Sequence, residues 1–528
     1  MLGLELVVVI GVTTLVSKLI ARKTGIAQPL LLVGIGVLIG LVPLFRDIQL
    51  APEVVLFLFL PAILYWESLT TSLREIRSNL RGIVLMSTGL VVVTAAAVAV
   101  LAHAMGLPWG AAWTLGAAIA PTDATAVTSF TRSLPRRNVT ILRAESLVND
   151  GTALVLWSLA VGFTVGDTDV SPGVVSLTLV IAYVGAALVG ALVAWLALLA
   201  RRRLRDAITQ NIAMLLTPFI AYLLAELIHA SGVLAVVVAG LIISQSGPRT
   251  GVAEGRRQSD AFWTFVTFLL NASLFVLVGI ELPRATSELA QSDLGMGIAA
   301  IAAVTGVIVA VRFAYLFATV YLIRLLDRRP QQRERRMSDR ARVVSGLAGM
   351  RGAVSLAAAL AVPATLVNGA PFPGRDFIVF VTAGVIVTTL VFQGLLLPAV
   401  VRWAHLPSDE SVGHELHLAE TSATRAALDE LPGLARRLRV DRAISERIQG
   451  EFEEHLELLE VEEESRDAEE VAERIRQDTE LRLALLQRKR EEVTRLRDRG
   501  EIDDIVLRDV QRRLDVEEVR LTGREPGE

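Results

Sequence analysis

The sequence predicts an all-α protein that crosses a membrane many times and ends in a charged helical tail. Of its 528 residues, 53% are hydrophobic, and the mean hydropathy is +0.53, which a soluble chain of this length would not sustain. The hydrophobic residues form repeated runs of roughly 18–25 residues, long enough to cross a hydrocarbon core as helices. The runs do not alternate apolar and polar residues, which excludes a membrane β-barrel.

About thirteen of these runs are candidate membrane spans. They cover residues 2–20, 27–44, 50–66, 82–104, 108–130, 141–163, 173–200, 207–229, 231–245, 261–281, 294–325, 343–365 and 376–401. The first run has neither a preceding basic segment nor a small-residue cleavage site, so we expect a permanent helix and not a signal peptide. The chain contains no cysteine, which excludes disulfides and thiolate metal sites.

Basic residues alternate between the loops and predict the orientation. The loops after the odd-numbered spans are rich in arginine, with eight arginines from Arg324 to Arg342, whereas the other loops hold only Arg46, Arg284 and Arg375. Basic residues in short loops favour the cytoplasmic side. We therefore expect an N-terminus outside the cell, a cytoplasmic tail and a location in the inner (plasma) membrane.

The composition changes near residue 407. Residues 1–406 carry 31 basic and 21 acidic side chains, a net charge of +10, whereas residues 407–528 carry 21 basic and 34 acidic ones, a net charge of −13. We expect a transmembrane domain over 1–406 and a charged helical tail over 407–528, with a regulatory or oligomerising role. The tail has amphipathic spacing but no phosphate loop, metal cluster or basic nucleic-acid surface.

The fifth span contains a proline followed by oxygen-bearing side chains. Pro121 removes a backbone donor within the helix and leaves carbonyl groups free just before Thr122 and Asp123. Carbonyl, hydroxyl and carboxylate oxygens are the ligands that a small dehydrated cation requires. The alternative is a proline kink in which Asp123 only caps the following half-helix.

The sixth span carries two acids in the segment from Glu145 to Asp150. Ser146 and Asp150 are four residues apart and share a helix face, while Glu145 and Asn149 share the adjacent face. One face thus offers a hydroxyl and a carboxylate to an ion, and its neighbour offers an acid and an amide for structural bonding. Alternatively, both acids only hydrogen-bond between helices, which would require a basic partner for each.

A basic partner is present in the twelfth span, where Arg351 lies among glycines. Glycines at this density let a helix unwind or pack closely. Spans 5 and 12 are therefore the two interrupted segments, one in each half of the chain. Paired interrupted helices are typical of inverted-repeat transporters.

Other polar groups in the predicted spans are less informative. Glu67 and Arg312 could pair across the fold, although Glu67 lies near a span end where it could reach water. Asn271 could shape an ion cavity or bond two helices together.

Motifs along the membrane part resemble one family, the monovalent cation:proton antiporters, in the electroneutral branch that includes the sodium/proton exchangers. The matching segments begin at Phe59 (FLPAILYWE), Ala120 (APTD), Glu145 (ESLVNDG), Ser231 (SGVLAVVVAG), Phe268 (FLLNASLF) and Gly349 (GMRGAVSL). The resemblance implies a thirteen-helix fold with inverted repeats, two crossing broken helices, a core domain and a dimerisation domain.

The resemblance also implies roles for the site residues. The cation would be held by Asp150 and Ser146, with Thr122 and Asp123 completing a site in which Na⁺ contacts Asp123 and Asp150. Glu145 and Arg351 would form a supporting pair. Asn149 occupies the position of a second aspartate in the electrogenic branch, so the chain resembles an electroneutral exchanger. The resemblance also implies a homodimer.

From these residues we hypothesise that H⁺ and Na⁺ or Li⁺ compete for Asp150, with Asp123 nearby, in an alternating-access cycle. K⁺ is a further candidate substrate. We expect no cofactor, no enzymatic activity and no nucleic-acid partner. The alternatives are an intramembrane aspartyl protease, for which Asp123 lacks a flanking glycine, and a passive cation channel, which would need no protonatable ligand.

Overall fold

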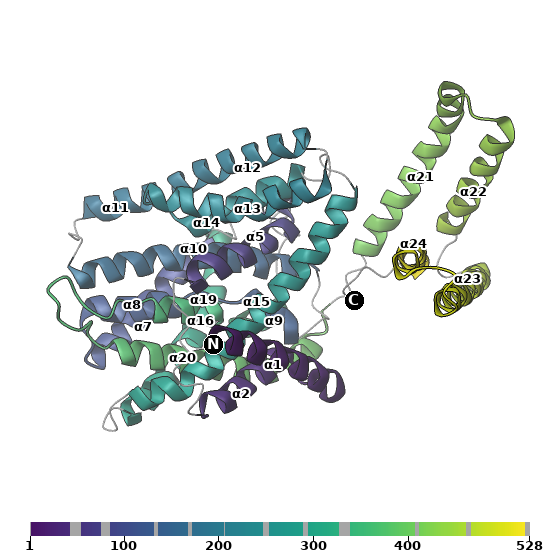
Figure 1. Cartoon of the computed structure of the whole chain (residues 1–528). Helices are drawn as coiled ribbons and strands as arrows, with labels where there is room; N and C mark the ends of the chain where they lie inside the picture. The colour runs from purple at the N-terminus through teal and green to yellow at the C-terminus, as the bar shows by residue number, and fades with distance from the viewer. Residues whose placement is uncertain are drawn as a thin grey trace. The chain divides into compact units, whose positions relative to one another are not determined.

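The computed structural model describes residues 2–42, 54–74, 76, 85–130, 136–166, 172–204, 206–246, 253–288, 294–326, 338–406, 411–460 and 466–522. The chain divides into two compact units, Met1–Pro407 and Ser408–Glu528 (Figure 1). We call the first the membrane unit and the second the tail unit. The basic loop segments 77–84, 131–135, 247–252 and 327–337 lie outside the described residues.

Apart from one isolated bridge between Thr365 and Pro371, the described part of the membrane unit is helical. Its elements are α1 (Leu2–Thr24), α2 (Gln28–Gly40), η1 (Val55–Phe59), α5 (Leu60–Thr70), η2 (Leu85–Gly89), α7 (Leu90–Ala104), α8 (Trp109–Ile119), α9 (Ala124–Phe130), α10 (Arg136–Val165), α11 (Pro172–Val180), η3 (Ile181–Gly185), α12 (Ala186–Arg203), α13 (Ala207–Leu227), α14 (Gly232–Ser246), α15 (Ala253–Glu288), α16 (Leu294–Leu326), α18 (Asp339–Leu347), α19 (Ala353–Leu360) and α20 (Arg375–Ala404).

Where they are described, the predicted spans fall mainly on helices, apart from the two breaks described below, which confirms the all-α membrane fold. In the described residues, 7 helices are long and apolar enough to cross a membrane, and three shorter apolar helices lie at Gln28–Gly40, Val55–Thr70 and Gly232–Ser246. The exact number of crossings stays a prediction. Three spans contain a π-helical turn, η1, η2 or η3, and such turns are frequent at functional sites.

Both predicted interruptions are present. The fifth span is divided into α8 and α9 by residues 120–123, and the twelfth into α18 and α19 by residues 348–352. The two breaks contact each other, because the backbone N–H of Asp123 donates to the carbonyl of Met350 at 2.8 Å. The prediction of two crossing broken helices is therefore confirmed.

Helix packing in the membrane unit repeats with an offset of seven spans. For example, α5 of span 3 packs on α14 of span 9, and α15 of span 10 packs on α2 of span 2; α8 and α9 pack on α10, and α18 and α19 pack on α20. An odd offset reverses the direction of each corresponding helix across the membrane. This arrangement is that of an inverted repeat.

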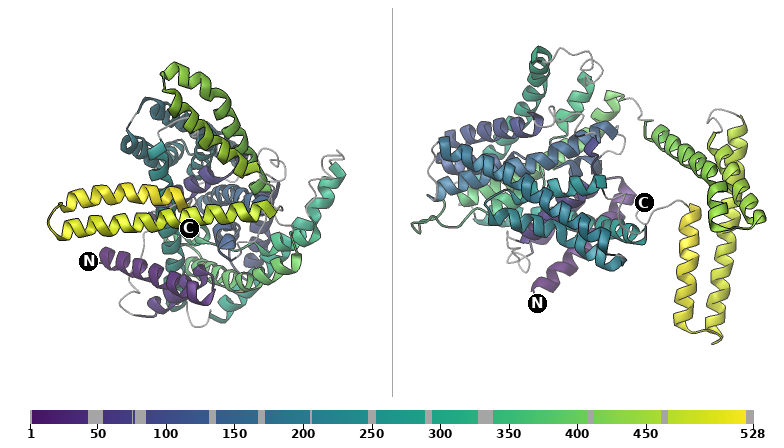
Figure 2. Two further views of the ribbon diagram at one scale, coloured as in Figure 1. Left: turned by 90° about the vertical axis from the view of Figure 1, so that its right-hand side faces the viewer. Right: turned by 90° about the horizontal axis from the view of Figure 1, so that it is seen from above.

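In its described residues, the tail unit contains four helices, α21 (Ser411–Leu438), α22 (Arg442–Glu460), α23 (Arg466–Asp498) and α24 (Asp504–Thr522). They form two antiparallel pairs, α21 with α22 and α23 with α24. Figure 2 shows the second pair as two long helices lying side by side. Leu507 and Leu514 on α24 and Leu486 on α23 are the buried apolar residues of the second pair. Arg490 of α23 also forms ion pairs with Asp515, at 2.5 Å, and with Glu518 of α24.

Candidate ion site

The predicted site residues come from two neighbouring segments, the break between α8 and α9 and the middle of α10. The break carries Thr122 and Asp123, and α10 carries Glu145, Ser146, Asn149 and Asp150. Pro121, at the break, lacks the N–H that would continue the helical ladder of α8, so the chain leaves the helix after Ile119. All the α10 side chains named here are at most 5% exposed.

A small cavity, which we call the ion cavity, brings the predicted cation ligands together. Its volume is about 40 Å³, and its polar lining consists of Glu67, Thr122, Asp123, Thr125, Ser146, Asp150, Asn271 and Ser355. The remaining walls are mostly apolar side chains of η1, α5 and α19. The acids, hydroxyl groups and amide of the lining therefore offer oxygen atoms of the kind that small cations prefer.

The two aspartates of the ion cavity differ in their bonding. Oδ1 of Asp123 accepts hydrogen bonds from the backbone N–H groups of Thr125, at 2.8 Å, and Ala126, at 3.0 Å, so this carboxylate caps the N-terminus of α9. For the Asp150 carboxylate, the described part of the chain supplies no hydrogen bond and no ion pair. Asp150 is thus a buried acid whose oxygens only a bound proton, water or cation can satisfy.

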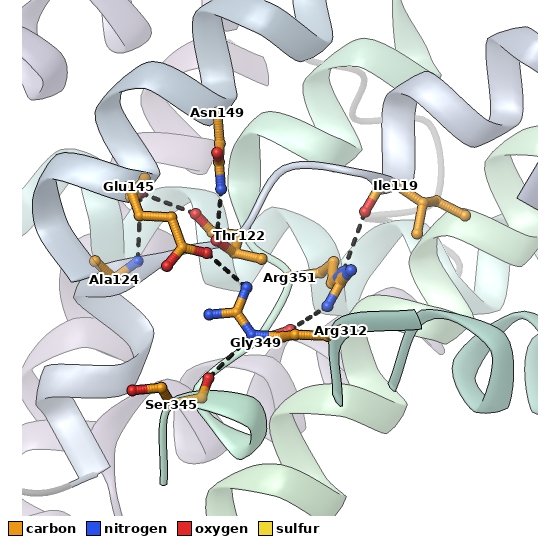
Figure 3. A network of polar contacts seen from close by, with 10 residues as sticks. Ile119, Thr122, Ala124, Glu145, Asn149, Arg312, Ser345, Gly349 and Arg351 are labelled. Carbon is orange, nitrogen blue, oxygen red and sulfur yellow. Dashed lines mark hydrogen bonds and ion pairs between the residues drawn. The ribbon is translucent and has the colours of Figure 1, made fainter. Parts of the chain in front are cut away.

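Thr122, Ser146 and Asn149 hold the break against α10. The Ser146 hydroxyl donates to the carbonyl of Thr122 at 2.8 Å, and the Asn149 amide bonds the Thr122 hydroxyl at 3.2 Å (Figure 3). With its nitrogen turned toward the carbonyls of Ser87 and Glu145, the Asn149 amide satisfies all three contacts. Asn149 is therefore a structural residue of this site.

The predicted ion pair between Glu145 and Arg351 is wrong, because the partner of Glu145 is another arginine. Glu145 Oε1 accepts instead from Nη1 of Arg312 on α16 at 2.6 Å, and Nε of Arg312 donates to the carbonyl of Ser345 at 3.0 Å (Figure 3). The side chains of Arg312 and Glu145 are only 2% and 5% exposed. The suggested pairing of Arg312 with Glu67 is excluded for the same reason.

Arg351 binds the carbonyl ends of broken helices. Its Nε donates to the carbonyl of Ile119, the last residue of α8, at 3.1 Å, and its Nη1 donates to the carbonyl of Gly349 (Figure 3). A guanidinium at a helix C-terminus interacts favourably with the helix dipole. Glu145 and Arg312 act on Arg351 only as neighbouring charges.

Glu67 faces the ion cavity. Its Oε1 accepts a hydrogen bond from the Thr125 hydroxyl at 2.6 Å, and both residues line the cavity together with Asn271. Glu67 is half-buried and also lines the larger cavity described next, so this structure is compatible with the alternative that Glu67 reaches water near a span end. The contact with Thr125 was not predicted, because the two residues are 58 positions apart in the sequence and lie on different helices.

A second, larger cavity adjoins the first, and we call it the vestibule. Its volume is about 260 Å³, and it shares Ile63, Glu67, Thr125 and Asn271 with the ion cavity. Arg143 of α10 also lines the vestibule, and sequence reasoning missed this residue. A signal was available, because Arg143 precedes Asp150 by seven residues and therefore shares its helix face.

Crossed broken helices and buried acids at a shared cavity define a secondary transporter. A family model described as "Sodium/hydrogen exchanger, transmembrane" matches residues 11–403. The chain belongs to this sodium/hydrogen exchanger family, and it is a multi-pass membrane protein of a family of antiporters. The resemblance found in the sequence motifs is thereby confirmed.

Two relatives in sequence illustrate this membership, and one solved structure shares the fold. A Mycobacterium tuberculosis protein described as an uncharacterized Na⁺/H⁺ exchanger is 45% identical over 521 residues, covering 98% of this chain and 96% of its own length. A Bacillus pumilus protein described as a sodium, potassium, lithium and rubidium/H⁺ antiporter is 32% identical, covering 71% of this chain and 57% of its own length. The solved structure of the sodium proton antiporter MjNhaP1 from Methanocaldococcus jannaschii covers 76% of this chain and 98% of its own, with a TM-score of 0.58 and 19% identity.

Proposed function

We propose that the protein exchanges Na⁺ or Li⁺ for H⁺ by competition of cation and proton for Asp150. The observation that carries this proposal is the Asp150 carboxylate, which is 5% exposed and faces the ion cavity without a hydrogen bond from the described residues. Burial disfavours a bare carboxylate, so either a proton or a cation must accompany it. Binding of one therefore excludes the other. Without either, the charged site would not cross the apolar barrier between the two sides of the membrane.

Asp123 contributes its charge and its remaining oxygen to the same site. Because one oxygen of Asp123 caps α9, this acid is fixed in place and Asp150 is the group that exchanges its proton. Ser146, Thr122, Glu67 and Asn271 line the cavity as further oxygen donors. We infer one-for-one, electroneutral exchange because Asn149, a neutral amide, occupies the position next to Asp150.

The orientation follows from the basic loops. The vestibule is lined by the first residue of α2 (Gln28), the last residue of α5 (Thr70), and residues further along α10 and α15, such as Arg143 and Thr264. Basic residues lie in the chain segments just before α2, α10 and α15 and just after α5. We propose that the vestibule opens to the cytoplasm and that the tail is cytoplasmic. We also propose that the protein is a homodimer in which the core domain moves relative to the dimerisation domain during the alternating-access cycle. The tail unit would regulate transport or join the two protomers.

Proteoliposomes test the proposal directly. Purified protein is reconstituted into inside-acidic liposomes, Na⁺, Li⁺ or K⁺ is added outside, and lumenal pH is followed with a dye. We expect Na⁺ and Li⁺ to alkalinise the lumen, and Asp150→Asn to reduce the rate at least a hundredfold, because an amide cannot exchange a proton. Glu281→Gln is the matched control, since Glu281 is a buried acid, 7% exposed, outside both cavities.

Three outcomes would contradict the proposal. Exchange that survives in Asp150→Asn would exclude Asp150 as the shared ligand. A cation current without proton movement would indicate a channel. A membrane potential generated by turnover, followed with a potential-sensitive dye, would exclude electroneutral exchange while leaving antiport intact.

A further inference from the structure

Arg143 is a positive charge on the path to a cation site. It lies on the face of α10 that also carries Ser146 and Asp150, three and seven residues further on. Seven residues of helix separate Arg143 from Asp150 by about 10 Å along the axis. Arg143 lines the vestibule, whereas Asp150 lines the ion cavity beyond it.

Among the described residues, none neutralises the Arg143 guanidinium by a direct ion pair. It is half-buried, and the carboxylates of the described residues form no salt bridge with it. Its charge does act on Glu67, which lines both cavities and is itself held by Thr125 at 2.6 Å. A guanidinium and a carboxylate therefore both line the vestibule, and the carboxylate also lines the ion cavity.

A fixed positive charge at this position has two physical effects. It lowers the local concentration of cations in the vestibule, and it reduces the negative potential that Glu67, Asp123 and Asp150 produce at the site. Other charges near the entrance are few among the described residues: Lys18 lies 4.9 Å from the ring of Phe268, which also lines the vestibule. Arg143 is the only basic residue in either described lining.

We propose that Arg143 determines the cation affinity of the exchanger, holding the apparent KM for Na⁺ high by its charge at the cavity entrance. Glu67 lines both cavities, so its negative charge partly offsets the effect of Arg143 on the site. The proposal deepens the proposed exchange of Na⁺ for H⁺ and rests on it. Arg143 acts on cation affinity through its charge, and it is not among the residues that line the ion cavity.

The test compares Arg143→Gln, Arg143→Lys and wild type in proteoliposomes, with the KM for Na⁺ and the maximal rate measured at low and high choline chloride. We expect Arg143→Gln to lower KM roughly threefold to tenfold, and Arg143→Lys to keep the wild-type KM because it keeps the charge. The difference should shrink at high ionic strength. Arg284→Gln, outside both cavities and paired with Glu281, should leave KM unchanged.

A binding measurement separates this inference from the proposed function. The Na⁺ concentration that half-maximally raises the Tm of the purified full-length protein in detergent should also fall in Arg143→Gln, whether or not the liposomes show exchange. An unchanged or higher midpoint and KM would overturn the role of Arg143, and so would a Lys variant that matches the Gln variant. A wild-type protein that binds Na⁺ but does not exchange it would instead overturn the proposed function.

Discussion

The two broken helices contact each other but carry opposite charges. The break between α8 and α9 presents Asp123, whose carboxylate caps α9. The break between α18 and α19 presents Arg351, whose guanidinium binds the carbonyl of Ile119 at the end of α8 and that of Gly349. The second break thus caps a helix of the first, and the N–H of Asp123 returns a hydrogen bond to Met350.

This difference shows that the breaks mainly hold the helices around the site in place. We call the two breaks and the helices they join the frame of the site. Their charges lie at buried helix ends whose backbone groups lack helical partners, where a carboxylate suits an N-terminus and a guanidinium suits a C-terminus. The acid left without a hydrogen bond from the described residues, Asp150, comes from the unbroken helix α10. We therefore expect changes at the breaks to act on stability and on the position of Asp123, and changes at Asp150 to act on the chemistry.

The largest effect is expected where α16 joins the frame. Arg312→Gln leaves Glu145 as a buried unpaired acid, which costs about 3–5 kcal/mol in soluble proteins, so we expect a strong fall in Tm and in the yield of folded protein. The double variant Arg312→Gln/Glu145→Gln removes both charges and should recover much of the loss. Thermal unfolding in detergent measures both. A double variant no more stable than the single one would show that the ion pair is not the cause.

A smaller effect is expected where the two breaks meet. Gly352 packs against the Asp123 carboxylate so closely that an added Cβ would overlap it. Gly352→Ala should therefore displace Asp123 and reduce exchange at least tenfold, while the protein stays folded. Gly295→Ala, where an added Cβ meets nothing within 4 Å, is the matched control. Equal exchange in the two variants would mean that the second break does not fix Asp123.

The frame was largely predictable from the sequence, because proline and glycine interrupt a helix at their own positions, whatever the rest of the fold. Pro121 and the glycines around Arg351 identified both breaks, and the spacing within α10 identified the face of Asp150. The partner of Glu145 was not predictable, because Arg312 and Arg351 lie on different helices and the choice depends on how α16 and α18 cross α10. The cavities that Glu67 and Arg143 line are formed by several helices, so their neighbours were not predictable, although the seven-residue spacing already placed Arg143 on the same face of α10 as Asp150.

The smallest effect is expected at Asp206, which repeats the capping geometry of Asp123 outside the membrane spans. Asp206 Oδ2 accepts from the backbone N–H of Thr209 at 2.8 Å and from its hydroxyl at 2.9 Å, and these bonds hold the pKa of Asp206 below its usual value. A lowered folded-state pKa contributes stability above the unfolded pKa of about 3.9 and loses it as the pH falls.

Comparing the two caps separates capping from ion binding. Asparagine caps a helix about as well as aspartate, so Asp206→Asn should leave exchange unchanged and only flatten the slight loss of Tm below about pH 4. Asp123→Asn should likewise keep α9 capped, yet lower exchange about tenfold by removing a charge from the ion cavity. Exchange rates and Tm measured between pH 3.5 and 8 (roughly, to bracket the carboxyl range) give both results. If Asp123→Asn exchanges as fast as Asp206→Asn, the role of Asp123 is capping alone and Asp150 is the sole acid of the exchange.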